Sequence, residues 1–301
     1  MDEQRYSRRD FMALAGVGGL VFASGLPGCA NMGQPGSAQR DFSFVQLSDV
    51  HWGYGNPKVN PDTRATVTRA IAAVNGMEQK PDFVVFTGDL TQSTDDPKLR
   101  RQRLREIKDI TAALNVPQIR FFAGEHDAAL DRGQAYLEVF GGALHYSFDH
   151  KGVHFIVLDN TSDPAPILGA AQLAWLKTDL AKFAPDAPIV VLTHRPLFAL
   201  LPQWDWATRD GAAAVELLMP YRNVTVFYGH IHHEHHHMTG HIAHHAAMAV
   251  MFPLSSVGTA PQKTQLPWDA AQPYKGLGWR AVGASASGSK PVLREVSLAK
   301  A

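Results

Sequence analysis

The stretch FSFVQLSDVH, residues 42–51, shows the pattern on which most of the chain is built. Its first six residues have the apolar content of a buried β-strand, and Asp49 and His51 follow directly after them. In extended backbone, residues two apart project to the same side, so the carboxylate and the imidazole face the same way. Two side chains that commonly bind metal ions therefore stand together at the end of a predicted strand.

The same pattern recurs along the chain, separated by segments with helical spacing. Helices are predicted from Asn60 onward, over 98–114 and over 170–183. Alternating strands and helices indicate an α/β layered core, in which the ends of strands hold ligands. The other predicted strands and the residues that follow them are 83–86 with Asp89, 119–123 with Glu125, His126 and Asp127, 153–158 with Asp159, 188–192 with His194, and 224–227 with His230 and His232.

Seven of these side chains offer the oxygen and nitrogen ligands of a dinuclear metal centre. One ion would not need so many, whereas two ions that share a bridging carboxylate would use them all. Imidazole with carboxylate and without thiolate suits manganese, iron or zinc, so we expect two such ions as cofactors. The predicted ligands are Asp49, His51, Asp89, Glu125, His194, His230 and His232.

From residue 41 onward the chain resembles the calcineurin-like metallophosphoesterase family. The resemblance rests on the ordered motifs Asp-x-His at 49–51, Gly-Asp at 88–89, Gly-x-His-Asp at 124–127, His194, and Gly-His-x-His at 229–232. Leu158-Asp159, Gly169 and the segment 172–176 make it similar to the branch that contains class III cyclic-nucleotide phosphodiesterases. The resemblance implies a four-layer α-β-β-α sandwich, with two mixed sheets flanked by helices, over residues 41–301.

The family also implies a role for each site residue. Asp49, His51 and His232 would bind the first metal, Asp89 would bridge, and His194, His230 and residue 125 would bind the second. His126 would be the catalytic histidine, with Asp127 hydrogen-bonded to its far nitrogen. The expected activity is hydrolysis of a small phosphodiester, by attack of a metal-bridging hydroxide with His126 as general acid. The alternatives are a phosphomonoesterase with the same site, or a periplasmic metal-binding or accessory protein on a weakened phosphoesterase scaffold.

Glu125 departs from the family pattern, which has asparagine at this position. A neutral amide becomes an anion with one more methylene, so three carboxylates face the two metals. The added negative charge is expected to bind cations more tightly, to make them poorer Lewis acids and to repel an anionic phosphate. Because His126 and Asp127 are both present, we expect an active enzyme with altered metal preference.

Residues 1–40 have the features of an export signal rather than of a folded domain. Ser7-Arg8-Arg9-x-Phe11 resembles a twin-arginine signal, and the apolar stretch 11–26 contains four glycines, which disfavour a membrane-spanning helix. We therefore expect passage through the twin-arginine export machinery and a periplasmic or exported location. Cys29 ends a lipobox-like run, so the N-terminus is either a lipid-anchored membrane tether or a cleaved signal.

The composition excludes several classes of protein. The 301 residues include 28 Lys and Arg against 28 Asp and Glu, so we expect no basic surface for nucleic acid. A single cysteine excludes an intramolecular disulfide framework and a cysteine-based zinc module. The arginines of 98–114 are interspersed with acids, which favours a solvated helix face over a phosphate-binding stripe.

Histidines are unusually frequent and concentrate in residues 230–245. The chain has 15 histidines, and a predicted turn at 238–240 makes this segment a hairpin, with 241–251 as the returning strand. Its additional histidines are either an auxiliary transition-metal surface or exposed polar side chains. Trp204 and Trp206, with Trp52 and Tyr54, are either an aromatic wall for a planar leaving group or ordinary core residues.

Overall fold

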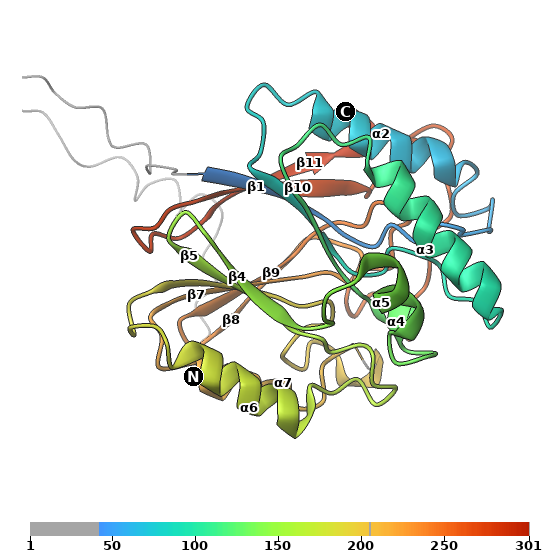
Figure 1. Ribbon diagram of the computed structural model, residues 1–301. Helices are drawn as coiled ribbons and strands as arrows, with labels where there is room; N and C mark the ends of the chain where they lie inside the picture. Colours follow the sequence, from blue (N-terminus) through green and yellow to red (C-terminus); the bar gives the residue numbers. More distant parts are fainter. Residues whose placement is uncertain (1–41, 205, 301) are drawn as a thin grey trace, which may run out of the picture. The chain divides into compact units, whose positions relative to one another are not determined.

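The computed structural model describes residues 42–204 and 206–300, which contain two β-sheets packed face to face (Figure 1). The five-stranded sheet has the order β11-β10-β1-β2-β3, and the six-stranded sheet has the order β4-β5-β6-β7-β9-β8. Both sheets are mixed, because β1-β2-β3 and β5-β6-β7-β9 are parallel while their neighbours are antiparallel. The strands are β1 Phe42–Leu47, β2 Phe83–Thr87, β3 Ile119–Phe122, β4 Tyr146–His150, β5 Val153–Val157, β6 Pro188–Leu192, β7 Asn223–Tyr228, β8 His235–Thr239, β9 Ile242–Ala246, β10 Gly278–Ala284 and β11 Val292–Ser297.

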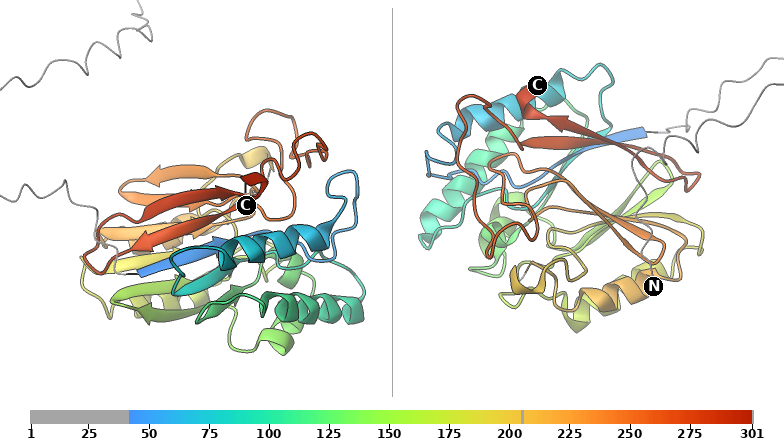
Figure 2. Two further views of the ribbon diagram at one scale, coloured as in Figure 1. Left: turned by 90° about the horizontal axis from the view of Figure 1, so that it is seen from above. Right: turned by 180° about the vertical axis from the view of Figure 1, so that it is seen from behind.

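Helices cover the outer face of each sheet and complete four layers (Figures 1 and 2). Helices α2 and α3 lie on the five-stranded sheet, and α6 and α7 lie on the six-stranded sheet. The expected sandwich of two mixed sheets flanked by helices is therefore confirmed. The helices are α2 Thr63–Asn75, α3 Pro97–Thr111, α4 Glu125–Ala128, α5 Gln134–Phe140, α6 Gly169–Leu180 and α7 Gly211–Leu218.

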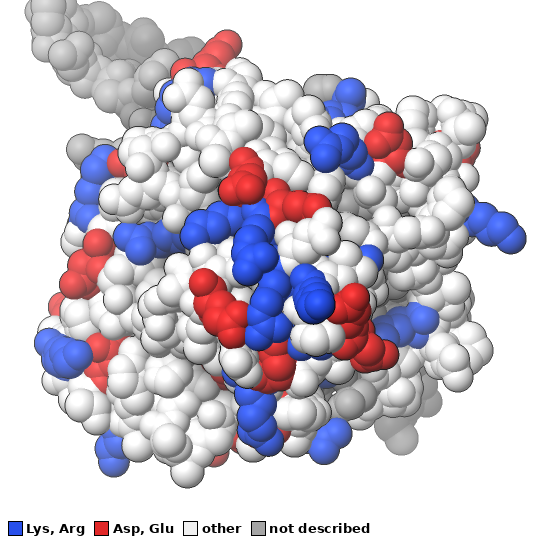
Figure 3. Space-filling model, turned by 45° about the vertical axis from the view of Figure 1, so that its right-hand side comes forward, with Lys and Arg blue, Asp and Glu red and all other residues white. Residues whose placement is uncertain are grey.

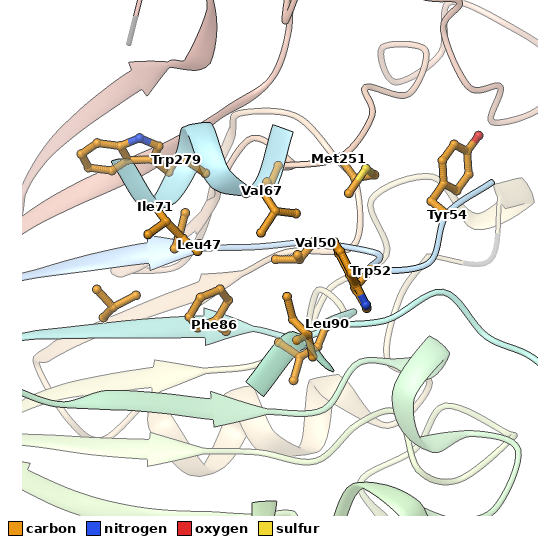
Figure 4. Packing of buried hydrophobic residues seen from close by; sticks show 14 of the residues in the cluster. Leu47, Val50, Trp52, Tyr54, Val67, Ile71, Phe86, Leu90, Met251 and Trp279 are labelled. Atoms are coloured by element: carbon orange, nitrogen blue, oxygen red, sulfur yellow. The ribbon is translucent and has the colours of Figure 1, made fainter. Parts of the chain in front are cut away.

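Three apolar layers hold the sandwich together. Between the sheets, Phe44 stacks on Phe83 at 5.0 Å and meets Phe155 and Phe227 edge-on at 5.6 Å. A second layer packs α2 and α3 on the five-stranded sheet (Figure 4), and a third packs α6 and α7 on the six-stranded sheet. Strand interiors are almost wholly apolar because both sides of each central strand are buried.

The first predicted helix begins later than expected. Asp62, not Asn60, is the N-cap, and its side chain accepts a hydrogen bond of 2.8 Å from the backbone N–H of Ala65. Asn60 is buried, and its amide donates to the carbonyl of Met251 at 2.8 Å. The Asn60 side chain, which the sequence pattern assigned to the helix cap, is therefore used in a tertiary contact instead.

Three of the four arginines of α3, Arg101, Arg103 and Arg105, are at least partly exposed, and Arg101 pairs with Glu138 at 2.5 Å. The fourth, Arg100, is buried and pairs with Asp131 at 2.8 Å. Figure 3 shows basic and acidic side chains next to one another on the face that it presents, as on a solvated helix surface. These pairings support the solvated-face interpretation over a phosphate-binding stripe.

The four aromatic residues considered for a substrate wall are buried in the core. Trp52 and Tyr54 belong to the layer beneath α2 (Figure 4), and Trp204 and Trp206 pack with Tyr228. The exposed fraction of each is 8% or less. The packing interpretation therefore holds, since none of these rings presents a surface to solvent.

A charge network around the buried His154 and Asp179 joins α6 to its sheet. His154 lies between Asp149, at 2.7 Å from Nδ1, and Asp179, at 2.8 Å from Nε2, and Lys182 lies 2.7 Å from Asp179. Burial by itself would raise the pKa of Asp179, but Lys182 and His154 outweigh it and the pKa is lowered.

The histidine-rich segment contains the hairpin β8-β9, with Thr239 paired to Ile242 and Gly240 at a φ of +60° in the turn. The returning strand ends at Ala246, which is shorter than predicted, because residues 247–251 leave the sheet toward β1 and hydrogen-bond to Ser48 and Asp49.

Two expectations about the chain's N-terminus, the export signal and lipidation at Cys29, lie outside the described residues. Within the part of the chain that the structure describes, no helix has the length and apolar character needed to cross a membrane.

Candidate metal centre

The structure brings all seven predicted ligands into one site, where they form two clusters that share Asp89. Within each cluster the candidate ligand atoms lie within 4.8 Å of one another. These residues follow β1, β2, β6 and β7, except Glu125, which opens α4. The first cluster is Asp49, His51, Asp89 and His232, and the second is Asp89, Glu125, His194 and His230.

Asp89 lies where a bridging ligand belongs. Its Oδ2 is 3.6 Å from Nε2 of His51 in the first cluster and 3.3 Å from Nε2 of His194 in the second. Its other oxygen, Oδ1, accepts a hydrogen bond of 2.9 Å from the backbone N–H of His126. One carboxylate oxygen thus faces both clusters while the other holds the start of α4.

Backbone carbonyls fix the orientation of two imidazoles. Nδ1 of His194 lies 2.7 Å from the carbonyl of Thr87, and Nδ1 of His232 lies 2.7 Å from that of Phe252. A carbonyl only accepts, so each Nδ1 carries the proton and each Nε2 presents a lone pair to the site. Metal-binding histidines are commonly held in this way.

The site contains buried polar atoms that no described residue satisfies. Nε2 of His194 and Oε2 of Glu125, which face the second cluster, have no partner with hydrogen-bond geometry. Unsatisfied polar atoms in a buried site are costly unless another group binds them. This donor set of imidazoles and carboxylates fits two divalent cations.

Five of the seven ligands have left-handed backbone, which is unusual for residues with a Cβ. Such conformations persist where the surrounding structure enforces them, and they gather at functional sites. Here they turn the chain sharply after each strand and point side chains into the site. The residues and their φ angles are Asp49 +55°, His51 +42°, Asp89 +49°, His230 +66° and His232 +59°.

Two glycines permit the close approach of the loops. A Cβ on Gly124 would lie 2.1 Å from Oδ1 of Asp89, and one on Gly88 would lie 2.4 Å from Nδ1 of His194. Gly88 also has a φ of +88°. The site therefore has no room for a Cβ at either position, which explains the glycine in the Gly-Asp motif and the one in the Gly-x-His-Asp motif.

The electrostatics of the site favour ionised carboxylates and divide its imidazoles into two groups. Burial would lower the pKa of His194 and of His232, but Asp89 and Glu125 raise the pKa of His194 and Asp49 raises that of His232. Burial alone would raise the pKa of Asp49, but His232 and His194 outweigh it and the pKa is lowered. Burial and the neighbouring His126 lower the pKa of His51 to about 3, and burial lowers that of His230 to about 4 despite Glu125. Neutral imidazole and carboxylate are the forms that bind metal ions.

Glu125 lies between two histidines of the second cluster. Its Oε1 is 2.7 Å from Nδ1 of His230, and its Oε2 is 2.9 Å from Nε2 of His194. Burial raises its pKa, but the two histidines outweigh this, so the pKa lies well below the usual range. The guanidinium of Arg195 is 3.9 Å from Oε1. The departure from asparagine thus places a third ionised carboxylate in the site.

The prediction that Asp127 hydrogen-bonds to the ring of His126 is wrong. Asp127 accepts from the backbone N–H groups of Leu90 at 2.9 Å, Thr91 at 2.8 Å and Gly124 at 2.9 Å, and from the Thr91 hydroxyl at 2.9 Å. The two residues are consecutive in a helix, where neighbouring side chains do not face each other. Asp127 therefore joins the loops that carry Asp89 and Glu125, instead of orienting the histidine.

Ser93 takes the place expected for Asp127. Its hydroxyl oxygen lies 3.0 Å from Nδ1 of His126, and its backbone N–H lies 3.3 Å from the same nitrogen. The ring of His126 meets that of His51 edge-on, with centroids 4.7 Å apart, so it adjoins the first cluster. No motif in the sequence points to Ser93, which lies in the loop after β2.

Comparison with known proteins identifies the family. Residues 42–234 match the family described as calcineurin-like phosphoesterase. The chain is 28% identical to serine/threonine-protein phosphatase CPPED1 of Danio rerio over 218 residues, covering 64% of this chain and 70% of that protein. It is 30% identical to the cAMP/cGMP dual specificity phosphodiesterase MT0825 of Mycobacterium tuberculosis over 205 residues, 64% of this chain and 62% of that one.

Solved structures share the fold at low sequence identity. A dimetal phosphatase from Danio rerio superposes with a TM-score of 0.60 at 13% identity, covering 86% of this chain and 97% of that one. The purple acid phosphatase PPD1 of yellow lupin superposes with a TM-score of 0.58 at 15% identity, covering 85% of this chain and 51% of that one.

Proposed function

Because the chain belongs to the calcineurin-like phosphoesterase family, and so is a metal-dependent phosphoric ester hydrolase, we propose that its substrate is a small phosphodiester. The observation that carries this proposal is the third ionised carboxylate, Glu125, beside the two candidate metal positions. At neutral pH a diester carries one negative charge and a monoester nearly two. The added carboxylate repels the monoester more strongly, and it therefore favours the diester.

Two metal ions are the expected cofactors, and the residues present fit them. Asp49, His51 and His232 would hold the first ion, Glu125, His194 and His230 the second, and Asp89 both. When bound, such ions supply positive charge to phosphoryl oxygens and activate a water molecule for attack on phosphorus.

His126 is proposed as the general acid that protonates the leaving alkoxide. The backbone N–H of Ser93 donates to Nδ1 of His126 at 3.3 Å, so the ring carries its proton on Nε2, from where it can be transferred. The Ser93 hydroxyl lies 3.0 Å from the same Nδ1 and helps to hold the ring. The backbone N–H of His126 is anchored to Asp89, so the acid is tied to the residue between the two clusters. Ser93 acts through His126 and is a positioning residue.

The test compares two aryl substrates on the same metal-reconstituted protein. We expect bis(p-nitrophenyl) phosphate to be hydrolysed with a higher kcat/KM than p-nitrophenyl phosphate, and Glu125→Gln to narrow that preference about tenfold. Glu138→Gln is the matched control, because Glu138 lies on the surface in an ion pair with Arg101. A preference for the monoester, or an unchanged preference in Glu125→Gln, would contradict the proposal.

The second candidate function is metal binding without hydrolysis, which the extra carboxylate and the histidine-rich hairpin favour. Stoichiometric metal in the central site, together with no turnover of either ester across manganese, iron and zinc, would support this candidate.

Export is proposed from the N-terminal sequence alone. We propose that Arg8 and Arg9 direct the folded protein through the twin-arginine machinery and that Cys29 is the site of lipidation. Replacing both arginines with lysine is expected to retain the protein in the cytoplasm, and mass spectrometry of the mature N-terminus shows whether Cys29 carries lipid.

A further inference from the structure

The β8-β9 hairpin contains two cross-strand histidine pairs that the central site does not use. In the register of the hairpin His236 lies opposite His245 and His237 lies opposite His244. Successive residues of a strand point to opposite faces, so the two pairs occupy different sides of the hairpin. His245 also lies opposite Phe227 of β7, with ring centroids 5.7 Å apart, and so is on the side that faces the other sheet.

The pair His236 and His245 has its ring nitrogens close together. Their Nδ1 atoms are 2.7 Å apart, and Nε2 of His236 lies 3.0 Å from Oε1 of Glu234. A carboxylate only accepts, so Nε2 of His236 carries a proton, Nδ1 of His236 presents a lone pair, and Nδ1–H of His245 donates to it. A metal ion bound between the two nitrogens would take the place of this proton. A carboxylate on the far nitrogen of a histidine is a common arrangement behind a metal ligand.

The spacing of the two nitrogens distinguishes between metal geometries. With a metal–nitrogen distance of about 2.0 Å, two cis ligands at 90° are about 2.8 Å apart, and two tetrahedral ligands about 3.3 Å apart. The observed 2.7 Å agrees with the square-planar value and requires no rearrangement of the strands. Square-planar nitrogen coordination is preferred by Cu(II) and Ni(II).

The surroundings of this pair accept a divalent cation. The side chain of His236 is 46% exposed, so an ion reaches it from solvent. Glu234 faces it from its own chain segment, and Glu295 of β11 lies nearby with Arg280 of β10 as its ion-pair partner. Glu234 and Glu295 supply negative charge near His236, whereas the guanidinium of Arg280 lies near His245.

We propose that His236 and His245 form a copper(II)- or nickel(II)-binding site at the edge of the six-stranded sheet, separate from the central pair of clusters. The site supplies two cis nitrogen ligands, and water completes the coordination. Among residues 42–204 and 206–300, groups of three or more metal-binding side chains occur only at the central site. The hairpin site is therefore expected to bind more weakly and exchangeably.

The other histidine pair is less suited to chelation. The ring centroids of His237 and His244 are 5.9 Å apart, against 4.9 Å for His236 and His245. Phe198 stacks on His237 at 3.8 Å, and His244 has no exposed surface. This pair packs against an aromatic ring and is not open to an ion from solvent.

The experiment titrates CuSO₄ into the full chain after the central site has been filled with Zn²⁺. Elemental analysis checks that the zinc stays bound, because copper(II) can compete for the same ligands. We expect one additional copper per chain, with two nitrogen ligands in the electron paramagnetic resonance spectrum. His236→Ala is expected to weaken this binding at least tenfold, whereas His241→Ala is not. His241 serves as the matched control because it is an exposed histidine of the same hairpin, bonded to the carbonyl of Tyr221 at 2.7 Å.

Equal copper binding by His236→Ala and His241→Ala would overturn the proposal, as would a spectrum with fewer than two nitrogen ligands. The phosphodiester proposal is judged separately, because the rate of ester hydrolysis of His236→Ala without copper is expected to equal that of the unaltered chain.

Discussion

Replacing Asp127 with asparagine tests whether this residue joins the site loops or orients the catalytic histidine. The side chain is 1% exposed, and each carboxylate oxygen accepts two hydrogen bonds. Burial and the nearby Asp89 raise its pKa to about 6, although the backbone N–H groups favour the ionised form. At about pH 8 the carboxyl is therefore ionised and all four bonds are charge-assisted.

The cost of Asp127→Asn follows from these four bonds. The amide oxygen of asparagine replaces the oxygen that accepts from Leu90 and Gly124, and its NH₂ group then faces the backbone N–H of Thr91. The Thr91 hydroxyl can rotate and accept, but the Thr91 N–H is left without an acceptor. One orphaned buried donor costs roughly 1–3 kcal/mol. The raised pKa of Asp127 means that its buried charge is itself unfavourable, so loss of the charge does not add to this cost. The expected loss is about 1–3 kcal/mol of the free energy of unfolding.

Urea denaturation at pH 8 measures this loss. With an m-value of about 3 kcal/mol per molar, the midpoint falls by roughly 0.3–1 M. Asp62→Asn is the control, because Asp62 caps α2 with one accepted bond of 2.8 Å and asparagine caps equally well. If Asp127→Asn kept the midpoint of the unaltered chain but lost activity as fully as His126→Ala, the assignment of Asp127 as a link between loops would be refuted.

Three further outcomes are expected. Ser93→Ala should lower kcat about three- to tenfold for an alkyl phosphodiester but barely for an aryl one, because only the alkoxide leaving group needs a proton from His126. Stopped assays on both substrates measure this, and equal losses of kcat on the two would count against it. Gly124→Ala should reduce bound metal below two ions per chain by elemental analysis, because its Cβ would lie 2.1 Å from Oδ1 of Asp89. Asp179→Asn should make the free energy of unfolding depend less on pH in the acid range, as measured by urea titrations at a series of pH values. The folded-state pKa of Asp179 is lowered, so its ionised carboxylate contributes fully to stability above about pH 5, and this contribution is lost below about pH 4. Parallel curves of unfolding free energy against pH for the two proteins would argue against it.

The sequence predicted the parts of the structure that depend on local pattern. Strands such as Phe42–Leu47 and Pro188–Leu192 have the predicted bounds, because buried parallel strands are continuous apolar runs. The seven ligands were found because each follows such a run, and the ends of neighbouring parallel strands meet at one edge of a sheet.

Features set by tertiary contacts could not be predicted in this way. The partner of His126 was misassigned because Ser93 reaches it across 33 residues from a loop without any motif. Strands β10 and β11 were not predicted, although β10 pairs with β1 along its length. Their role depends on residues more than 230 positions away, which no short-range pattern records.

The left-handed backbone at the ligand positions also affects which substitutions this sequence can accept during evolution. Each non-glycine residue in that conformation costs roughly 1–2 kcal/mol, and glycine there avoids the steric part of that cost. Glycine in place of His51 or His232 would remove that steric cost but would leave a cavity beside Phe252, which packs on the two rings at 4.8 and 4.4 Å. Valine or isoleucine would add to the steric cost. The turns therefore restrict which residues can replace the ligands, even in a lineage that no longer needed the ions.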